Sequence, residues 1–162
     1  MDTTLSDAMQ AAPAGASYQP SMLAVNGRIG RLRYFTFSCV LAVAVMLVAV
    51  TSFLLFSPGM AMLVLAISYL AFIPASFVLM IRRLNDLDRS GWCSLAALVP
   101  FVNLALGLYA TFARGSAGPN RFGPAPVANS RALVMAAIGV LPAAFAIGLA
   151  AGMMGVSFRA LA

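Results

Sequence analysis

The chain has 162 residues, of which 62% are hydrophobic and only 9% are charged. Soluble domains carry about 25% charged residues, so this chain does not have enough charge to cover a surface that faces water. The composition therefore predicts an integral membrane protein. The net charge of +6 comes from ten arginines and four aspartates. Retention of arginine at the cytoplasmic membrane surface explains this excess, and we expect no nucleic acid as a partner.

The residue inventory also limits the chemistry. The sequence contains no histidine, lysine or glutamate, so most of the usual general acids and bases are missing. Two cysteines without a histidine cannot form a closed four-ligand zinc site within one chain. We therefore expect a protein that is not an enzyme and that uses no metal and no other cofactor.

Residues 1–24 are rich in Ala, Ser and Pro and show no apolar period, which predicts a flexible tail. From Met22 to Leu32 the apolar residues recur at helical spacing, which predicts a short helix in the headgroup layer. Tyr34 to Ile81 then contains no charge, and Ser57-Pro58-Gly59 interrupts it with turn residues. About 20 apolar residues cross a ~30 Å hydrocarbon core. Each half is long enough, so the pattern predicts two membrane helices joined by a tight turn.

Two further apolar segments follow. Residues 92–113 are uncharged, with Ser90 as an expected N-cap and with Pro100 and Asn103 inside, so we expect a kinked helix. A polar loop, 114–131, leads to the last segment. The fold expected is an all-α integral membrane protein with four transmembrane helices, at about 34–56, 59–81, 92–113 and 132–158. Its parts are a tail (1–24), a membrane domain with three spans (25–126) and an additional C-terminal transmembrane helix (127–162).

The arginines orient this arrangement. Three of them precede the first span and the Ser57–Gly59 turn has none, which predicts a cytoplasmic N-terminus and a cytoplasmic 82–92 loop. Four alternating spans place loop 114–131 outside and return the C-terminus, with Arg159, to the cytoplasm. Seven arginines are then cytoplasmic and three external. The alternative is a segment 92–113 that re-enters at Pro100, which leaves nine arginines cytoplasmic and one external. We expect four spans, because lipid-exposed irregular backbone is costly and 22 apolar residues are enough to cross.

The stretch RRLNDLDRSGW, residues 82–92, carries most of the candidate site. In a continuing helix, Arg82 and Asp86 are four residues apart and Arg83 and Asp86 are three apart, so both pairs can interact. The arginines could bind lipid phosphate in a forked geometry, or they could form an ion-pair network that only anchors the loop, which the pattern favours. The candidate contact residues, including those that precede the first span, are Arg28, Arg31, Arg82, Arg83, Asp86, Asp88, Arg89 and Trp92.

Two other patterns suggest interactions. The loop GSAGPNRFGP, 115–124, holds Asn120 and Arg121; an anion pocket is one interpretation, and a rigid turn is the one that its composition favours. In the last span Ala144, Gly148 and Gly152 recur at every fourth residue, a spacing that lets helices approach closely in a homo-oligomer or with a membrane partner. Chance in a helix rich in Ala and Gly explains this row equally well.

No span has an ionisable residue in its interior, which argues against a proton-coupled transporter. We therefore expect a protein that interacts with membrane lipids or a membrane partner through an arginine-rich cytoplasmic face. A small oligomeric transporter or channel subunit is the alternative, because Asn103 and the prolines leave a polar solute path open.

Three blocks of sequence together resemble one family. They are NGRIGRLRYFTF (26–37), IRRLNDLDRSGWCSLAALVPFVNL (81–104) and GSAGPNRFGPAP (115–126). These blocks, in this order, resemble those of the domain of unknown function 805 family. The members of that family are small bacterial inner-membrane proteins. The resemblance implies an inner-membrane location and no known activity. The chain departs from the family pattern at four positions. It has Asn85 where the family usually has His, Phe35 where Trp is common, Phe122 where Tyr is common and Ala125 where Asp is common.

Overall fold

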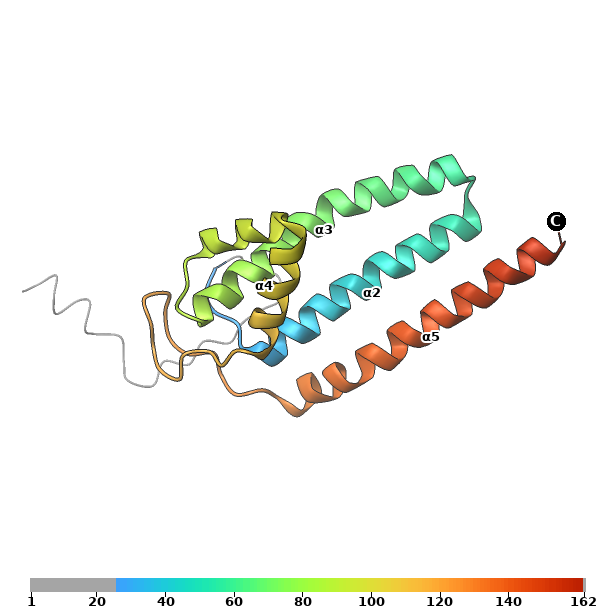
Figure 1. The fold of residues 1–162 in the computed structure, drawn as a ribbon. Coiled ribbons are helices and arrows are strands. Elements are labelled where there is room, and N and C mark those ends of the chain that lie inside the picture. The colour runs from blue at the N-terminus through green and yellow to red at the C-terminus, as the bar shows by residue number, and fades with distance from the viewer. Residues whose placement is uncertain (1–25, 162) are drawn as a thin grey trace, which may run out of the picture.

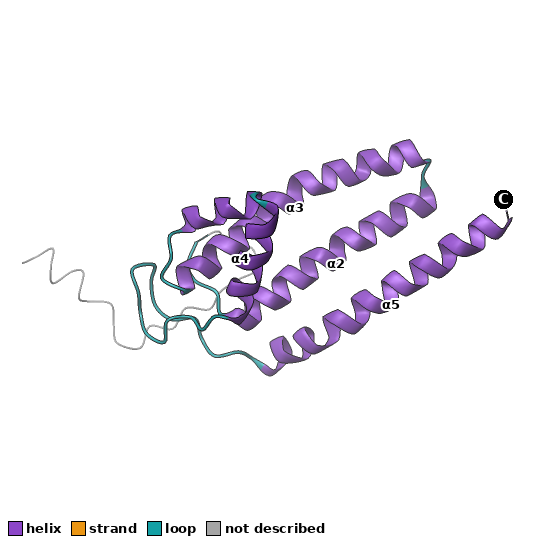
Figure 2. Ribbon diagram, viewed as in Figure 1, coloured by secondary structure: helices purple, strands orange, loops and turns teal. Residues whose placement is uncertain are grey.

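A computed structural model describes residues 26–161, so the predicted flexible tail lies outside the described residues. Its helices are α2 (Arg31–Leu55), α3 (Pro58–Asp86), the 3₁₀ helix η1 (Gly91–Leu98), α4 (Pro100–Phe112) and α5 (Arg131–Leu161). No strand occurs in this part of the chain, and a single isolated bridge joins Asn120 and Gly123. The expected all-helical architecture is confirmed (Figure 2).

The predicted helical hairpin is present. α2 ends at Leu55, where the Phe56 amide donates a hydrogen bond of 3.0 Å to the Ser52 carbonyl. α3 begins at Pro58, the position at which a proline loses no helical hydrogen bond. The two helices therefore lie antiparallel and side by side (Figure 1).

Helix α5 packs against α2 and against none of the other described helices. It begins at the end of the bundle opposite to the α2–α3 turn and runs toward that turn (Figure 1). The segments Arg31–Leu55, Pro58–Asp86 and Arg131–Ala150 are each long and apolar enough to cross a membrane.

The third predicted span differs from a single kinked helix. It consists of η1, with eight residues, and α4, with thirteen, separated at Val99, whose backbone is extended at φ −93° and ψ 120°. Pro100 explains the break, because a proline disfavours the helical conformation of the residue before it. Thirteen helical residues extend about 20 Å, which is shorter than the ~30 Å hydrocarbon core. Neither piece crosses the membrane alone.

The polar loop that follows α4 returns to the end of the bundle where η1 began. The Ser116 amide donates to the carbonyl of Asp86, the last residue of α3, at 2.9 Å. Loop 114–131 and loop 82–92 therefore lie at one end, opposite to the α2–α3 turn (Figure 1). The expectation that loop 114–131 lies on the other side is wrong, and the re-entrant arrangement is the one that the structure has. We call this end, with residues 26–33, 82–92 and 113–131, the arginine-rich end.

The predicted surface helix over residues 22–32 is also wrong for its described residues before Arg31. Residues 26–30 are not helical, and Gly27 has a φ of 91°, which favours glycine. The Ile29 amide instead donates to the Arg82 carbonyl at 3.3 Å, so this segment lies against the end of α3. That position brings Arg28 to Asp86.

Candidate functional site

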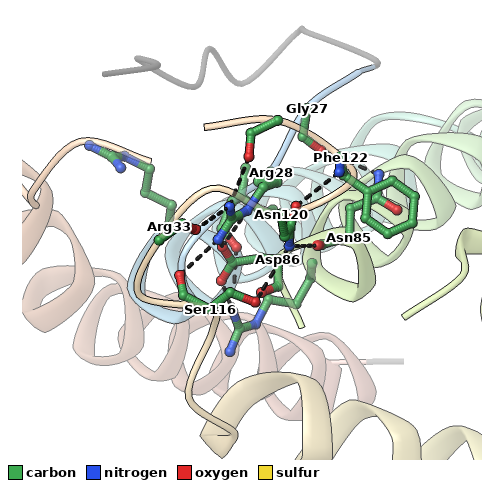
Figure 3. A network of polar contacts seen from close by, with 12 residues as sticks. Gly27, Arg28, Arg33, Asn85, Asp86, Ser116, Asn120 and Phe122 are labelled. Carbon is green, nitrogen blue, oxygen red and sulfur yellow. Dashed lines mark hydrogen bonds and ion pairs between the residues drawn. The ribbon is translucent and has the colours of Figure 1, made fainter. Parts of the chain in front are cut away.

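The arginine-rich end contains a buried carboxylate held by two arginines. Asp86 ends α3, and only 3% of it is exposed. Its Oδ1 accepts from Arg28 Nε at 3.2 Å and from Arg28 Nη2 at 3.1 Å, while its Oδ2 accepts from Arg83 Nη1 (Figure 3). Both oxygens are thus paired with buried guanidinium groups, and we call Arg28, Arg83 and Asp86 the hub.

Arg28 links this hub to the loop after α4. Beyond Asp86, its Nη1 donates to the Gly118 carbonyl at 2.8 Å and to the Gly123 carbonyl at 3.0 Å, and its Nη2 donates to the Ser116 carbonyl at 2.8 Å. All five guanidinium donors are therefore used, and the side chain is 0% exposed. A lysine has three donors on a single atom and could not replace this fork.

Arg83 links the hub to the end of α4. Its Nε donates to the Ala110 carbonyl at 2.6 Å, and its Nη2 donates to the Ala113 carbonyl. The last carbonyls of a helix have no partner within that helix, and they carry a partial negative charge. Arg83 therefore caps α4 and holds the re-entrant pair against α3.

Loop 114–131 in turn caps the end of α3. Asn120 Nδ2 donates to the Asn85 carbonyl at 2.8 Å, and Asn120 Oδ1 accepts from the Phe122 amide at 2.9 Å. Asn85 Nδ2 donates to the Gly27 carbonyl at 3.4 Å. Asn85 stands where the resemblance predicts a histidine, and it joins the N-terminal segment to α3 through a neutral amide (Figure 3).

Some hub contacts were not predicted from the sequence. A Cβ added to Gly115 would lie 1.9 Å from Asp86 Oδ2, so the loop backbone passes directly over the carboxylate. Ser116 and Gly118 supply carbonyls to Arg28. The glycine spacing in GSAG was the available signal, but a composition of turn formers does not say which side chain the turn covers.

The remaining predicted residues are divided between the interior and the surface. Arg82 is 0% exposed, whereas Arg31, Arg89 and Trp92 are exposed. Arg121 Nε pairs with Asp88 Oδ1 at 3.2 Å, with the two side chains 60% and 53% exposed. The two acids of loop 82–92 therefore have different partners: Asp86 binds the hub arginines, and Asp88 binds Arg121 of loop 114–131.

A pocket of about 350 Å³ lies beside the hub. Arg31, Arg33 and Arg114 line it, together with the Gly115–Ser116 backbone and Asp86. Arg33 is oriented by two carbonyls, those of Val127 at 2.7 Å and Ala128 at 3.1 Å. We call this the arginine pocket. Its charge suits an anion, and no cluster of three or more potential metal ligands occurs in the described part of the chain.

The family model described as "Protein of unknown function (DUF805)" matches residues 22–124. The chain belongs to the DUF805 family. The match contains η1, α4, the hub and most of the arginine pocket, whereas α5 lies outside it. The family resemblance drawn from the three sequence blocks is therefore confirmed, and α5 is an addition to the matched region.

Relatives in the family are named as membrane proteins. The chain is 34% identical to "Inner membrane protein YhaI" of Escherichia coli (strain K12) over 103 residues, which are 62% of this chain and 84% of the relative. It is 44% identical to "Inner membrane protein YhaH" of the same strain over 45 residues, which are 28% of this chain and 37% of that relative. No solved structure matches the chain.

Proposed function

We propose that this DUF805 protein is a non-enzymatic inner-membrane protein that binds the phosphate of acidic phospholipids in the arginine pocket. The observation that carries the proposal is the convergence of Arg31, Arg33 and Arg114 on one cavity at the end of the helical bundle. Guanidinium groups bind phosphate oxygens in a forked geometry. A cavity with three of them and one carboxylate that is already paired has a net positive charge.

The position of the pocket supports a lipid as the source of the phosphate. Arg31 and Arg33 lie in the first turn of α2, a helix long and apolar enough to cross the membrane. Side chains at that position lie in the headgroup layer, where lipid phosphates are concentrated. Nine of the ten arginines, those from Arg28 to Arg131, lie at the arginine-rich end. The positive-inside rule then assigns this end to the cytoplasm, whose leaflet is anionic.

Exposure separates the arginines that bind from those that hold the structure. Arg28 and Arg83 are 0% exposed and committed to Asp86 and to backbone carbonyls. Arg31 and Arg114 are exposed, and neither forms an ion pair within the described residues. We assign lipid binding to Arg31 and Arg114, with Arg33 as the fixed member of the pocket. The hub keeps Gly115 and Ser116 in place along the wall.

The test compares lipid retention between pocket variants. Arg31→Gln and Arg114→Gln are combined, and the purified protein is placed in nanodiscs of phosphatidylcholine with a minor fraction of phosphatidylglycerol. Each arginine near an anionic surface contributes about 1 kcal/mol, so the double variant is expected to lose about 30-fold in preference for phosphatidylglycerol. Native mass spectrometry of the released protein counts the bound lipids.

Arg89→Gln is the matched control, because Arg89 is exposed at the same end but does not line the pocket. It is expected to keep the preference. A loss of about fivefold from Arg89→Gln, the share of one charge, would mean that only the overall charge attracts lipid, and the pocket would be excluded. Inorganic phosphate added to the nanodiscs separates the two sources: displacement of phosphatidylglycerol at millimolar phosphate would assign the pocket to free phosphate.

A further inference from the structure

The start of α4 brings polar side chains together inside the apolar part of the bundle. Asn103 lies in the first turn of α4, which begins directly after the break at Val99. Its carboxamide makes no hydrogen bond within the described residues, and it is exposed. A carboxamide that faces hydrocarbon without a partner is costly. An occupant of the space beside Asn103 that forms hydrogen bonds would remove this cost.

Two cavities meet at this side chain. One, of about 640 Å³, lies between α2 and α4, and the other, of about 440 Å³, lies among α2, α3 and the η1–α4 pair. Both cavities are lined by Tyr34, Ser38 and Asn103, and we call these three residues the Asn103 site. The larger cavity is otherwise mostly apolar, and the smaller one also contains Ser76.

Tyr34 places a hydroxyl beside the same space, where its side chain is hydrogen-bonded to the side chain of Ser38. Tyr34 is only 8% exposed, and its hydroxyl lies 3.9 Å from the sulfur of Met80, which is a weak acceptor. A hydroxyl that both donates and accepts would serve Tyr34 and Asn103 at once.

We propose that the Asn103 site binds an uncharged, hydroxyl-bearing molecule. No arginine or aspartate lines either cavity, so a charged ligand would find no counter-charge there. Non-helical backbone at membrane depth is tolerated where it lines a cavity with polar contents, which fits the break at Val99. The molecule comes either from the bilayer, as a neutral lipid such as diacylglycerol, or from water, as a small polyol such as glycerol.

The lipid source is tested by photocrosslinking in nanodiscs. A photoactivatable diacylglycerol is compared with a phosphatidylcholine that carries the same reactive acyl chain, so that only the polar group differs. Diacylglycerol is expected to label residues 100–112 more strongly. Asn103→Leu is expected to lower this labelling by about five- to thirtyfold, the factor that one intramembrane hydrogen bond gives. Ser38→Ala, a smaller change, should lower it in the same direction.

The matched control is Thr51→Val. Thr51 is an exposed residue of α2 whose hydroxyl bonds to the Leu47 carbonyl of its own helix, and it lines neither cavity. This variant removes a polar group from the same span, and it should keep the labelling. Equal effects of Thr51→Val and Asn103→Leu would overturn the proposal.

The aqueous source is tested with a native cysteine. Cys39 lines the larger cavity, and Cys93→Ser leaves it as the one thiol of the chain. If the ligand enters from water, a membrane-impermeant methanethiosulfonate reagent modifies Cys39 and glycerol slows the reaction. The proposal is overturned if diacylglycerol shows no preference over phosphatidylcholine and glycerol has no effect on Cys39. It is also overturned if Asn103→Cys forms a disulfide between two copies in the membrane, because a second chain would then fill the site.

Discussion

Asp86 is the residue on which the arginine-rich end depends, because it is the one acid that faces both buried hub arginines. Three elements are joined at its carboxylate: the 26–30 segment through Arg28, α3 itself, and the end of α4 through Arg83. A buried ion pair does not by itself stabilise a fold, but removing one of its two partners leaves the other charge buried and unpaired. The contacts of Asp86 therefore specify an arrangement more than they add stability.

Replacement of Asp86 by Asn tests this role. The amide keeps the shape of the carboxylate but places an NH₂ group, a donor, opposite a donor of Arg28 or Arg83. We expect the unfolding free energy to fall by about 3–5 kcal/mol, measured by unfolding in mixed micelles with increasing sodium dodecyl sulfate. Asp88→Asn is the control: its pair with Arg121 is exposed, so the change should stay below about 1 kcal/mol. Equal losses from the two variants would contradict the hub.

Gly115 tests the close contact between the loop and the hub. Alanine there would place its Cβ 1.9 Å from Asp86 Oδ2, so Gly115→Ala must displace either the loop or the carboxylate. We expect a loss of about 1–3 kcal/mol, as for an overpacked interior. Gly118→Ala is the matched control in the same loop, because its added Cβ would meet no atom within 4 Å. The same micelle titration measures both variants, and a stable Gly115→Ala protein would show that the loop does not rest on Asp86.

At the scale of elements, the η1–α4 pair changes the topology of the chain. Pro100 breaks the segment at Val99, and Arg83 holds the end of α4 beside the end of α3. The two pieces together enter and leave at the same end of the bundle, with η1 against α3 and α4 against α2. This arrangement follows from contacts between residues about 30 positions apart, which local hydropathy does not contain.

Cysteine accessibility tests the re-entry. Ala117→Cys is placed on a Cys39→Ser, Cys93→Ser background, since Ala117 is exposed in the loop after α4. We expect an impermeant maleimide to label it only from the cytoplasmic side, in inverted vesicles. Ser57→Cys, in the α2–α3 turn, should be labelled only from the opposite side. Labelling of Ala117→Cys in intact cells would restore four alternating spans.

For the whole molecule, three long apolar helices and one re-entrant pair place the start of α2 and the end of α5 at opposite ends of the bundle (Figure 1). α2 begins at the arginine-rich end, and α5 begins there too and runs toward the α2–α3 turn (Figure 1). The sequence-based expectation of a cytoplasmic C-terminus assumed an even number of crossings. An odd number reverses it.

Reporter fusions after Ala162 test this reversal. Alkaline phosphatase is active only outside the cytoplasm and green fluorescent protein only within it. We expect an active phosphatase fusion and a dark fluorescent one at this position. The same reporters fused before Met1 should give the opposite result, because the arginine-rich end is assigned to the cytoplasm. A fluorescent C-terminal fusion would contradict three crossings.

The sequence by itself determined the class of protein, the α2–α3 hairpin, the start of α5 and the family. These features depend on hydropathy, on turn residues such as Ser57-Pro58-Gly59 and on local motifs, all of which act over a few neighbouring residues. The tertiary structure decided which charges are buried, where loop 114–131 lies and that Asn103 borders two cavities. Arg28 illustrates the reason: its partners Asp86, Ser116, Gly118 and Gly123 lie 58 to 95 positions away. Only the packing of α2, α3 and the η1–α4 pair brings them within hydrogen-bonding distance.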